Sequence, residues 1–185
     1  MSTEVYIGAG SNIDADTNLR KALESLIPRT NVTGVSIFYR SPAVGRPEQA
    51  SFTNGVLRAC WDGTAAELKF DVLRDIESRL GRSRGPDRYA DRPIDLDLLF
   101  FGQQVIHADD LTVPDTEILE RPYIYVPLLE LAPEIVLPGN GRLAQQVSGP
   151  LLPGMKKLQP AARLTEQLRA VWRHSMGRRG FQDPD

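Results

Sequence analysis

Hydrophobic positions in the first third of the chain alternate between strand and helix spacing. Residues 4–9 form a β-rich run that is predicted to end at a glycine-rich turn over 8–12. Apolar residues at i, i+3, i+4 and i+7 then predict a helix that reaches residue 26 and is stopped by Pro28. Alternating apolar residues predict one strand over 32–40.

The same alternation continues in the middle of the chain. A strand is predicted over 52–61 and a helix over 65–80. That helix opens with a capping box in which Thr64 and Glu67 can each satisfy a backbone N–H group. A polar loop separates it from a strand over 94–101.

The resulting order β-α-β-β-α-β defines an α+β class, in which an antiparallel sheet is flanked by helices. We expect the ferredoxin-like, or split βαβ, arrangement in a single domain. Residues 1–140 would form the domain. Residues 141–185 would form a C-terminal extension of unknown function, with a helix at about 160–174.

Composition excludes several classes of protein and site. The chain has 185 residues, 41% of them hydrophobic, and no apolar run approaches the ~20 residues of a membrane span. Its single cysteine, Cys60, excludes an internal disulfide, and the first residues predict no secretory signal, so we expect a cytoplasmic protein. The formal net charge of −2 combines +4 over residues 150–185 with −6 over residues 1–149, and this acidic body argues against nucleic-acid binding, which needs a basic face.

The stretch from residue 82 to residue 101 carries the candidate chemistry. Asp95 and Asp97 alternate with core residues, so they share one strand face, with Cα atoms about 6.6 Å apart. Such a pair can bind one or two divalent cations for phosphoryl chemistry, although a salt-bridged surface would also explain it. The loop before the pair supplies four arginines that suit phosphate oxygens, namely Arg82, Arg84, Arg88 and Arg92.

These residues resemble a known family, the 6-hydroxymethyl-7,8-dihydropterin pyrophosphokinases of folate biosynthesis. RYADRPIDLDLL over 88–99 resembles the family signature, and the stretches YIGAGSN, SIFYRSPAVG, FTNGV, IESRLGRSR and LTVP agree with it. RPYIYVPLLELAPE extends the resemblance to about residue 138. It implies an enzyme that transfers the β,γ-pyrophosphoryl group of ATP to the hydroxymethyl oxygen of the pterin and releases AMP.

The resemblance also implies a role for each matching residue. Asp95 and Asp97 would hold two Mg²⁺ ions that bridge the ATP phosphates, and the catalytic arginines would be Arg82 and Arg92. The nucleotide side would be lined by Glu77, Arg84, Arg88, Leu98, Leu111, Thr112 and Arg121. The pterin side would be formed by Pro42, Ala43, Val44, Phe52, Asn54 and Tyr123, with the two rings sandwiching the pterin. Without the resemblance, both rings are more typical of core residues.

Two departures from the family pattern place negative charge near the polyphosphate. Asp91 stands where the family has a small residue, and Asp115 replaces a histidine. Both should weaken ATP affinity unless arginines or metal compensate. They motivate an alternative, a non-catalytic homologue that binds nucleotide or a protein, such as another folate-pathway enzyme. An RNA-binding ferredoxin-like domain is disfavoured, because the aromatic–basic strand motif of such domains is absent.

Overall fold

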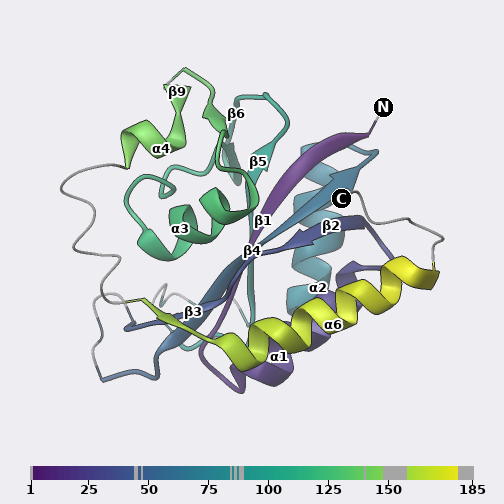
Figure 1. Cartoon of the computed structure of the whole chain (residues 1–185), viewed down its shortest axis with the longest axis vertical. Helices are drawn as coiled ribbons and strands as arrows, with labels where there is room; N and C mark the ends of the chain where they lie inside the picture. The colour runs from purple at the N-terminus through teal and green to yellow at the C-terminus, as the bar shows by residue number, and fades with distance from the viewer. Residues whose placement is uncertain are drawn as a thin grey trace.

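A six-stranded antiparallel sheet forms the centre of the computed structural model (Figure 1). The structure describes residues 2–43, 46, 48–83, 85, 87, 90–139, 141–147 and 158–178. Its strands follow the order β10-β3-β4-β1-β5, and β2 also pairs with β4. They are β1 (Thr3–Ser11), β2 (Asn31–Val35), β3 (Tyr39–Ser41), β4 (Phe52–Trp61), β5 (Asp95–Phe101) and β10 (Gln159–Pro160).

Two small strand pairs and a set of helices complete the fold. The strand pairs are β6 (Ile106–Ala108) with β7 (Leu111–Val113), and β8 (Val136–Leu137) with β9 (Gly141–Arg142). The helices are α1 (Ala15–Leu26), the π-helix η1 (Glu67–Leu73), α2 (Arg74–Arg79), α3 (Pro122–Leu131), α4 (Leu143–Gln146) and α6 (Ala162–Arg178). Among the described residues, no helix is long and apolar enough to cross a membrane.

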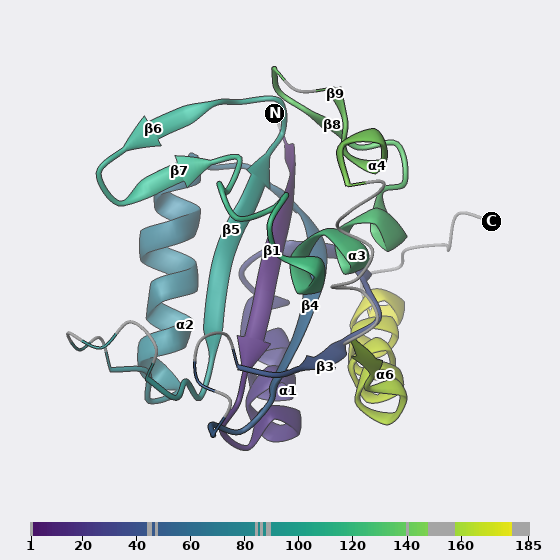
Figure 2. The ribbon, with the colours of Figure 1, turned by 90° about the vertical axis from the view of Figure 1, so that its left-hand side faces the viewer.

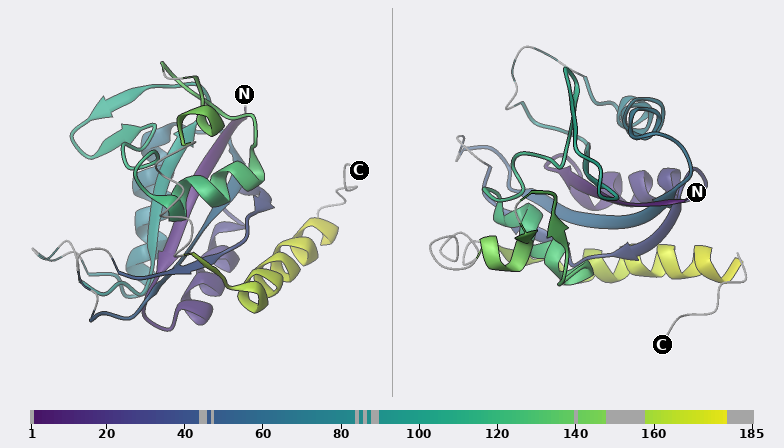
Figure 3. Two further views of the ribbon diagram at one scale, coloured as in Figure 1. Left: turned by 60° about the vertical axis from the view of Figure 1, so that its left-hand side comes forward. Right: turned by 90° about the horizontal axis from the view of Figure 1, so that it is seen from above.

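The helices bury both faces of the sheet. Helices α1 and α2 pack on one face around Leu26, Leu57 and Leu68, whereas α3 and α4 cover the other around Phe100 and Tyr125 (Figure 2). Helix α6 runs beside β2 and contacts α1, at one edge of the sheet (Figure 3). The predicted α+β class with an antiparallel sheet is therefore confirmed.

The capping box at the start of the second helical segment is confirmed. The Thr64 N–H donates to Glu67 Oε2 (2.7 Å), and the Glu67 N–H donates to Thr64 Oγ1 (3.2 Å). The helix then continues as η1 before it becomes α2. A π-helical stretch shifts backbone pairing from i→i+4 to i→i+5, and the four-residue apolar spacing of 68–80 did not distinguish it from an α-helix.

Two predicted boundaries in the first third of the chain are wrong. The expected turn at residues 8–12 begins too early, because β1 continues to Ser11 with partners on both sides. The expected strand 32–40 is broken into β2 and β3. At the break, Ser36 Oγ accepts the Val56 N–H (2.8 Å), so a side chain replaces a backbone partner and interrupts the ladder.

Candidate active site

A cavity opens on one face of the sheet, over the three neighbouring strands β4, β1 and β5. The register places Gly10 of β1 opposite both Asn54 of β4 and Asp95 of β5, and places Gly8 opposite Asp97. Because Gly8 and Gly10 have no side chains, the flanking strands stand above a recessed floor. The cavity has a volume of about 330 Å³.

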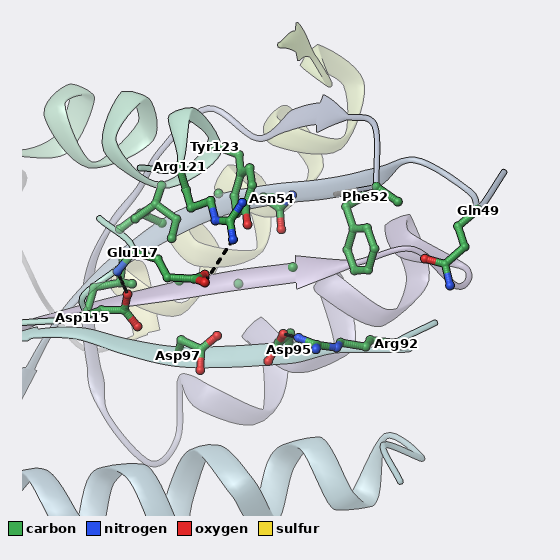
Figure 4. A pocket seen from close by; sticks show the side chains of 18 of the residues that line it. Gln49, Phe52, Asn54, Arg92, Asp95, Asp97, Asp115, Glu117, Arg121 and Tyr123 are labelled. Carbon is green, nitrogen blue, oxygen red and sulfur yellow. Dashed lines mark hydrogen bonds and ion pairs between the residues drawn. The ribbon is translucent and has the colours of Figure 1, made fainter. Parts of the chain in front are cut away.

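The acidic pair occupies one wall of this cavity. Asp95 and Asp97 both project from β5 towards the space over β1 (Figure 4). Asp95 forms ion pairs with Arg82 and Arg92. Burial alone would raise the pKa of Asp95, but the two guanidinium charges outweigh it and hold that pKa below its usual range. This carboxylate is therefore ionised, and the two arginines already balance its negative charge.

Asp97 is neutralised by a lysine from the π-helix η1. Lys69 Nζ lies 2.9 Å from Asp97 Oδ1 and 3.4 Å from the Leu96 carbonyl oxygen. Enclosure in the site and repulsion from Asp95 raise the pKa of Asp97, while Lys69 opposes this rise. Asp97 is thus the acid of the pair that most needs a further positive charge.

The buried carboxylate of Glu77 positions Arg82 beside the acidic pair. Glu77 on α2 accepts the Leu96 N–H of β5 (2.8 Å) and forms an ion pair with Arg82. Its side chain is only 3% exposed. Arg82 therefore lies between Glu77 and Asp95, which fixes the direction of its guanidinium group.

Aromatic and amide side chains form the opposite wall. Phe52 and Asn54 come from β4, and Tyr123 comes from the first turn of α3 (Figure 4). Burial raises the pKa of Tyr123 to about 12, so its hydroxyl stays protonated at neutral pH. Ala43 also lines the cavity. This wall offers two rings and a hydrogen-bonding amide.

A second acidic group lies between the two walls, in the segment before α3. Asp115 accepts the Glu117 N–H (2.7 Å), and Glu117 pairs with Arg121 (3.1 Å). Burial and the nearby charge of Asp97 raise the pKa of Asp115 to about 6, although the hydrogen bond from Glu117 opposes this shift. Within the described residues, the buried Nε of Arg121 has no hydrogen-bond partner.

A family model describes the same region of the chain. The model named 7,8-dihydro-6-hydroxymethylpterin-pyrophosphokinase matches residues 6–133. The chain belongs to this pyrophosphokinase family. The resemblance noted from the sequence motifs is thereby confirmed, and residues 6–133 include every described residue that lines the cavity.

Curated relatives agree with this assignment. The 2-amino-4-hydroxy-6-hydroxymethyldihydropteridine pyrophosphokinase of Pseudomonas aeruginosa is 33% identical and aligns with 87% of this chain and 100% of its own length. The protein of the same name from Haemophilus influenzae is 32% identical over 84% of this chain and 98% of its own. The folate synthesis bifunctional protein of Arabidopsis thaliana is 36% identical over 69% of this chain but only 27% of its own length.

Many of the residues expected for a pyrophosphokinase meet in the cavity, and others do not. The predicted residues that line it are Ala43, Phe52, Asn54, Arg92, Asp95, Asp97, Arg121 and Tyr123. Arg82 and Glu77 do not line the cavity, but Arg82 lies behind the acidic wall and forms ion pairs with both Glu77 and Asp95. The structure does not bring Pro42, Leu98, Leu111 or Thr112 to the cavity. Val44, Arg84 and Arg88 lie outside the described residues.

The sequence analysis missed three features of this pyrophosphokinase site. Lys69 was not selected, yet it contacts Asp97 from the helix that packs against β5. Gln49 and Glu117 also line the cavity and were not selected. Only Lys69 left a signal, as a cation next to the apolar stripe of the helix that precedes the acidic strand.

We predict that Asp115→Asn changes how stability depends on pH. A carboxyl group whose pKa is raised in the folded state makes the protein less stable as pH rises from about 4 to above 6. Asparagine does not titrate but can still accept the Glu117 N–H. The variant should therefore gain on the order of 1–3 kcal/mol relative to wild type between pH 4.5 and pH 7.

Urea unfolding without divalent cations, at both pH values, measures this gain. Asp16→Asn on the exposed side of α1 is the matched control for the loss of one surface charge. A difference between Asp115→Asn and wild type that is the same at both pH values would contradict the prediction.

Proposed function

We propose that this chain transfers the β,γ-pyrophosphoryl group of ATP to the hydroxymethyl oxygen of 6-hydroxymethyl-7,8-dihydropterin and releases AMP. One observation carries the proposal in this family member: the acidic wall with its cations and the aromatic wall face each other across a glycine floor. The first wall suits Mg²⁺ and polyphosphate, and the second suits a flat heteroaromatic ring with polar edges.

We further propose a ferredoxin-like topology and a division into a catalytic domain, 1–140, and an extension, 141–185. The order β5-β1-β4-β2, with α1 after β1 and α2 before β5, supports the split βαβ arrangement. The family match over residues 6–133 supports the division. Association with another folate-pathway enzyme stays a prediction.

The donor set at the acidic wall fits Mg²⁺, and two bound ions are proposed. Carboxylate oxygens are the ligands that this ion prefers, and it usually keeps sites for substrate phosphates. Among the described residues, no three His, Cys, Asp or Glu side chains gather to hold a metal. Asp95 and Asp97 would therefore share the ions with phosphate oxygens. When bound, the ions would neutralise charge that develops on the transferring group.

The cationic side chains of the site would bind and orient the polyphosphate. Arg82 and Arg92 already lie against Asp95, so their charges stand beside the position of the transferring group. The Nε of Arg121, which has no hydrogen-bond partner in the part of the chain that the structure describes, offers a further donor from the far side of the cavity. Guanidinium groups on both sides would hold the chain of phosphates in line with the acceptor.

The aromatic wall would place the acceptor hydroxyl. Phe52 and Tyr123 would stack on the pterin, while Asn54 would hydrogen-bond its edge. The pterin oxygen would then form a bond to the β-phosphorus, and the bond from this phosphorus to the oxygen of AMP would break. The hydroxyl proton leaves the acceptor in the same reaction. The protein contributes position and charge rather than a covalent intermediate.

Asp91 and Asp115 are expected to weaken ATP binding. The extent depends on which neighbouring groups offset the negative charge of each carboxylate. Asp91 accepts a hydrogen bond from Asn12 Nδ2 (2.5 Å) at the end of the arginine loop. Asp115 lies near Lys69, whose charge opposes the rise in its pKa. Because Arg82, Arg92 and the acid pair are all present, the non-catalytic alternative is not favoured.

We predict that Asp97→Asn lowers kcat about 100-fold or more, because the amide keeps the shape but loses the charge that holds the cation. The assay follows AMP formed from ATP, Mg²⁺ and the hydroxymethyl-dihydropterin. Asp16→Asn on α1 should keep wild-type activity. An Asp97→Asn protein with wild-type kcat, or wild-type protein that folds but forms ADP instead of AMP, would refute the proposal.

We predict opposite effects of Lys69→Met on two ligands. Without nucleotide, Lys69 competes with a metal ion for Asp97, so its removal should tighten Mn²⁺ binding by about three- to tenfold. In the presence of metal, the variant should bind ATP more weakly, because a cation beside the phosphates is lost. Electron paramagnetic resonance of free Mn²⁺ and isothermal titration with ATP measure the two affinities.

Lys21→Met on α1 is the control for loss of a surface charge. If Lys69 only supported the fold, its replacement would weaken both ligands together. Unchanged or weaker Mn²⁺ binding by Lys69→Met would therefore rule out competition at Asp97.

We predict that Gly10→Ala raises the KM for the pterin at least about tenfold, with a much smaller effect on the KM for ATP. A Cβ at residue 10 would overlap Asn54 Oδ1, so the amide must move away from the pterin edge. Gly177→Ala near the end of α6 provides a control, because no atom lies within 4 Å of a Cβ there and its backbone is not left-handed. An equal rise in both KM values, or none, would show that Asn54 does not read the pterin.

A further inference from the structure

The C-terminal segment, residues 158–178, covers one edge of the sheet. This edge is formed by β2 and β3, which both pair with β4. Strand β10 pairs with β3 through Gln159 and Pro160. Helix α6 follows β2, where Arg169 Nε donates to the Val35 carbonyl oxygen (3.2 Å) and Trp172 Nε1 donates to the Val32 carbonyl oxygen (3.0 Å). Side chains of a helix thus satisfy backbone groups that an edge strand would expose.

The two parts of this segment meet at Phe38, in the break between β2 and β3. The Ala161 N–H donates to the Phe38 carbonyl oxygen (2.8 Å), and the Phe38 N–H donates to Thr165 Oγ1 (2.9 Å). Phe38 is 1% exposed and Thr165 is 2% exposed. The C-terminal segment therefore fixes the position of the buried Phe38 backbone, whose N–H and carbonyl groups it pairs.

Phe38 connects this edge to the aromatic wall of the cavity. Its ring packs so closely under β4 that a Cβ on Gly55 would lie 2.5 Å from the ring. Gly55 and the preceding Asn54 both line the cavity. The next residue after Phe38, Tyr39, pairs directly with Asn54. A shift of Phe38 must therefore move the strand segment that carries Asn54, because the contact leaves no free space.

We infer that Thr165 is a positioning residue for the pterin: through Phe38, the C-terminal segment sets the position of Asn54. This inference rests on the proposed function, since it needs Asn54 to contact the pterin. The segment lies beyond residues 6–133 that the family model matches. On this inference, the C-terminal extension contributes to substrate binding as well as to stability.

Thr165→Val tests this role, because valine keeps the shape but cannot accept the Phe38 N–H. The KM for the pterin should rise about three- to tenfold, while kcat and the KM for ATP change less than about twofold. Thr165→Ser keeps the acceptor and should restore the wild-type KM. An unchanged pterin KM, an equal rise in both KM values, or a serine variant that resembles valine would overturn the inference.

Trp172→Phe is the matched control for stability. It removes one hydrogen bond from the same helix, but to Val32, far along β2 from the cavity. Thermal unfolding should show a loss of stability in both variants, whereas only Thr165→Val should raise the pterin KM. A similar rise in Trp172→Phe would mean that loosening of α6 in general, and not the contact at Phe38, is responsible.

Hydrogen exchange of the wild-type chain provides a test that needs no variant. Coupling between two sites is reciprocal, so bound pterin should slow amide exchange in residues 158–165 as well as in β3 and β4. Slowing confined to β3 and β4 would overturn the inference. Asn54→Ala separates the two claims: if its pterin KM is unchanged, the proposed pterin site fails, whatever the result at Thr165.

Discussion

Repulsion between two carboxylates on one strand is the constraint to which the rest of the site responds. Asp95 and Asp97 point into the same cavity, where the negative charge of each makes ionisation of the other less favourable unless positive groups lie nearby. The chain supplies them unequally: Arg82 and Arg92 form ion pairs with Asp95, whereas among the described residues Asp97 forms an ion pair with Lys69 and is influenced by Arg82 only from a greater distance. This asymmetry holds the pKa of Asp95 low and raises that of Asp97, so we propose that Asp97 is the acid that gains more from an additional cation.

The sheet solves the second problem, which is to bring a polyphosphate and a flat ring together. Antiparallel pairing aligns Asn54, Gly10 and Asp95 in one row across three strands. The missing side chain of Gly10 leaves space between the acidic wall and the aromatic wall, and Asn54 lies next to it. The edge contacts of Thr165 and Phe38 then fix the outer strand of this row from the far side. The proposed metal site, the proposed acceptor site and the protected edge of the sheet thus all depend on the same strand register.

Local signals were enough to predict much of this arrangement. Strand alternation correctly placed Asp95 and Asp97 on a common face, and the capping box correctly placed the start of the helix that carries Glu77. The break at Ser36 was not predictable, because it depends on a hydrogen bond to Val56 twenty residues away. Lys69 was missed for the same reason, since a lysine on a helix looks like a solvated residue until its distant partner is known.

A crystal structure with Mg²⁺ and an ATP analogue that has a methylene bridge between the α- and β-phosphates tests this account most directly. We predict metal density between Asp95 and Asp97, phosphate oxygens completing its coordination, and Lys69 turned from Asp97 towards the phosphates. A metal ion held by phosphates alone, with Lys69 still paired to Asp97, would contradict it.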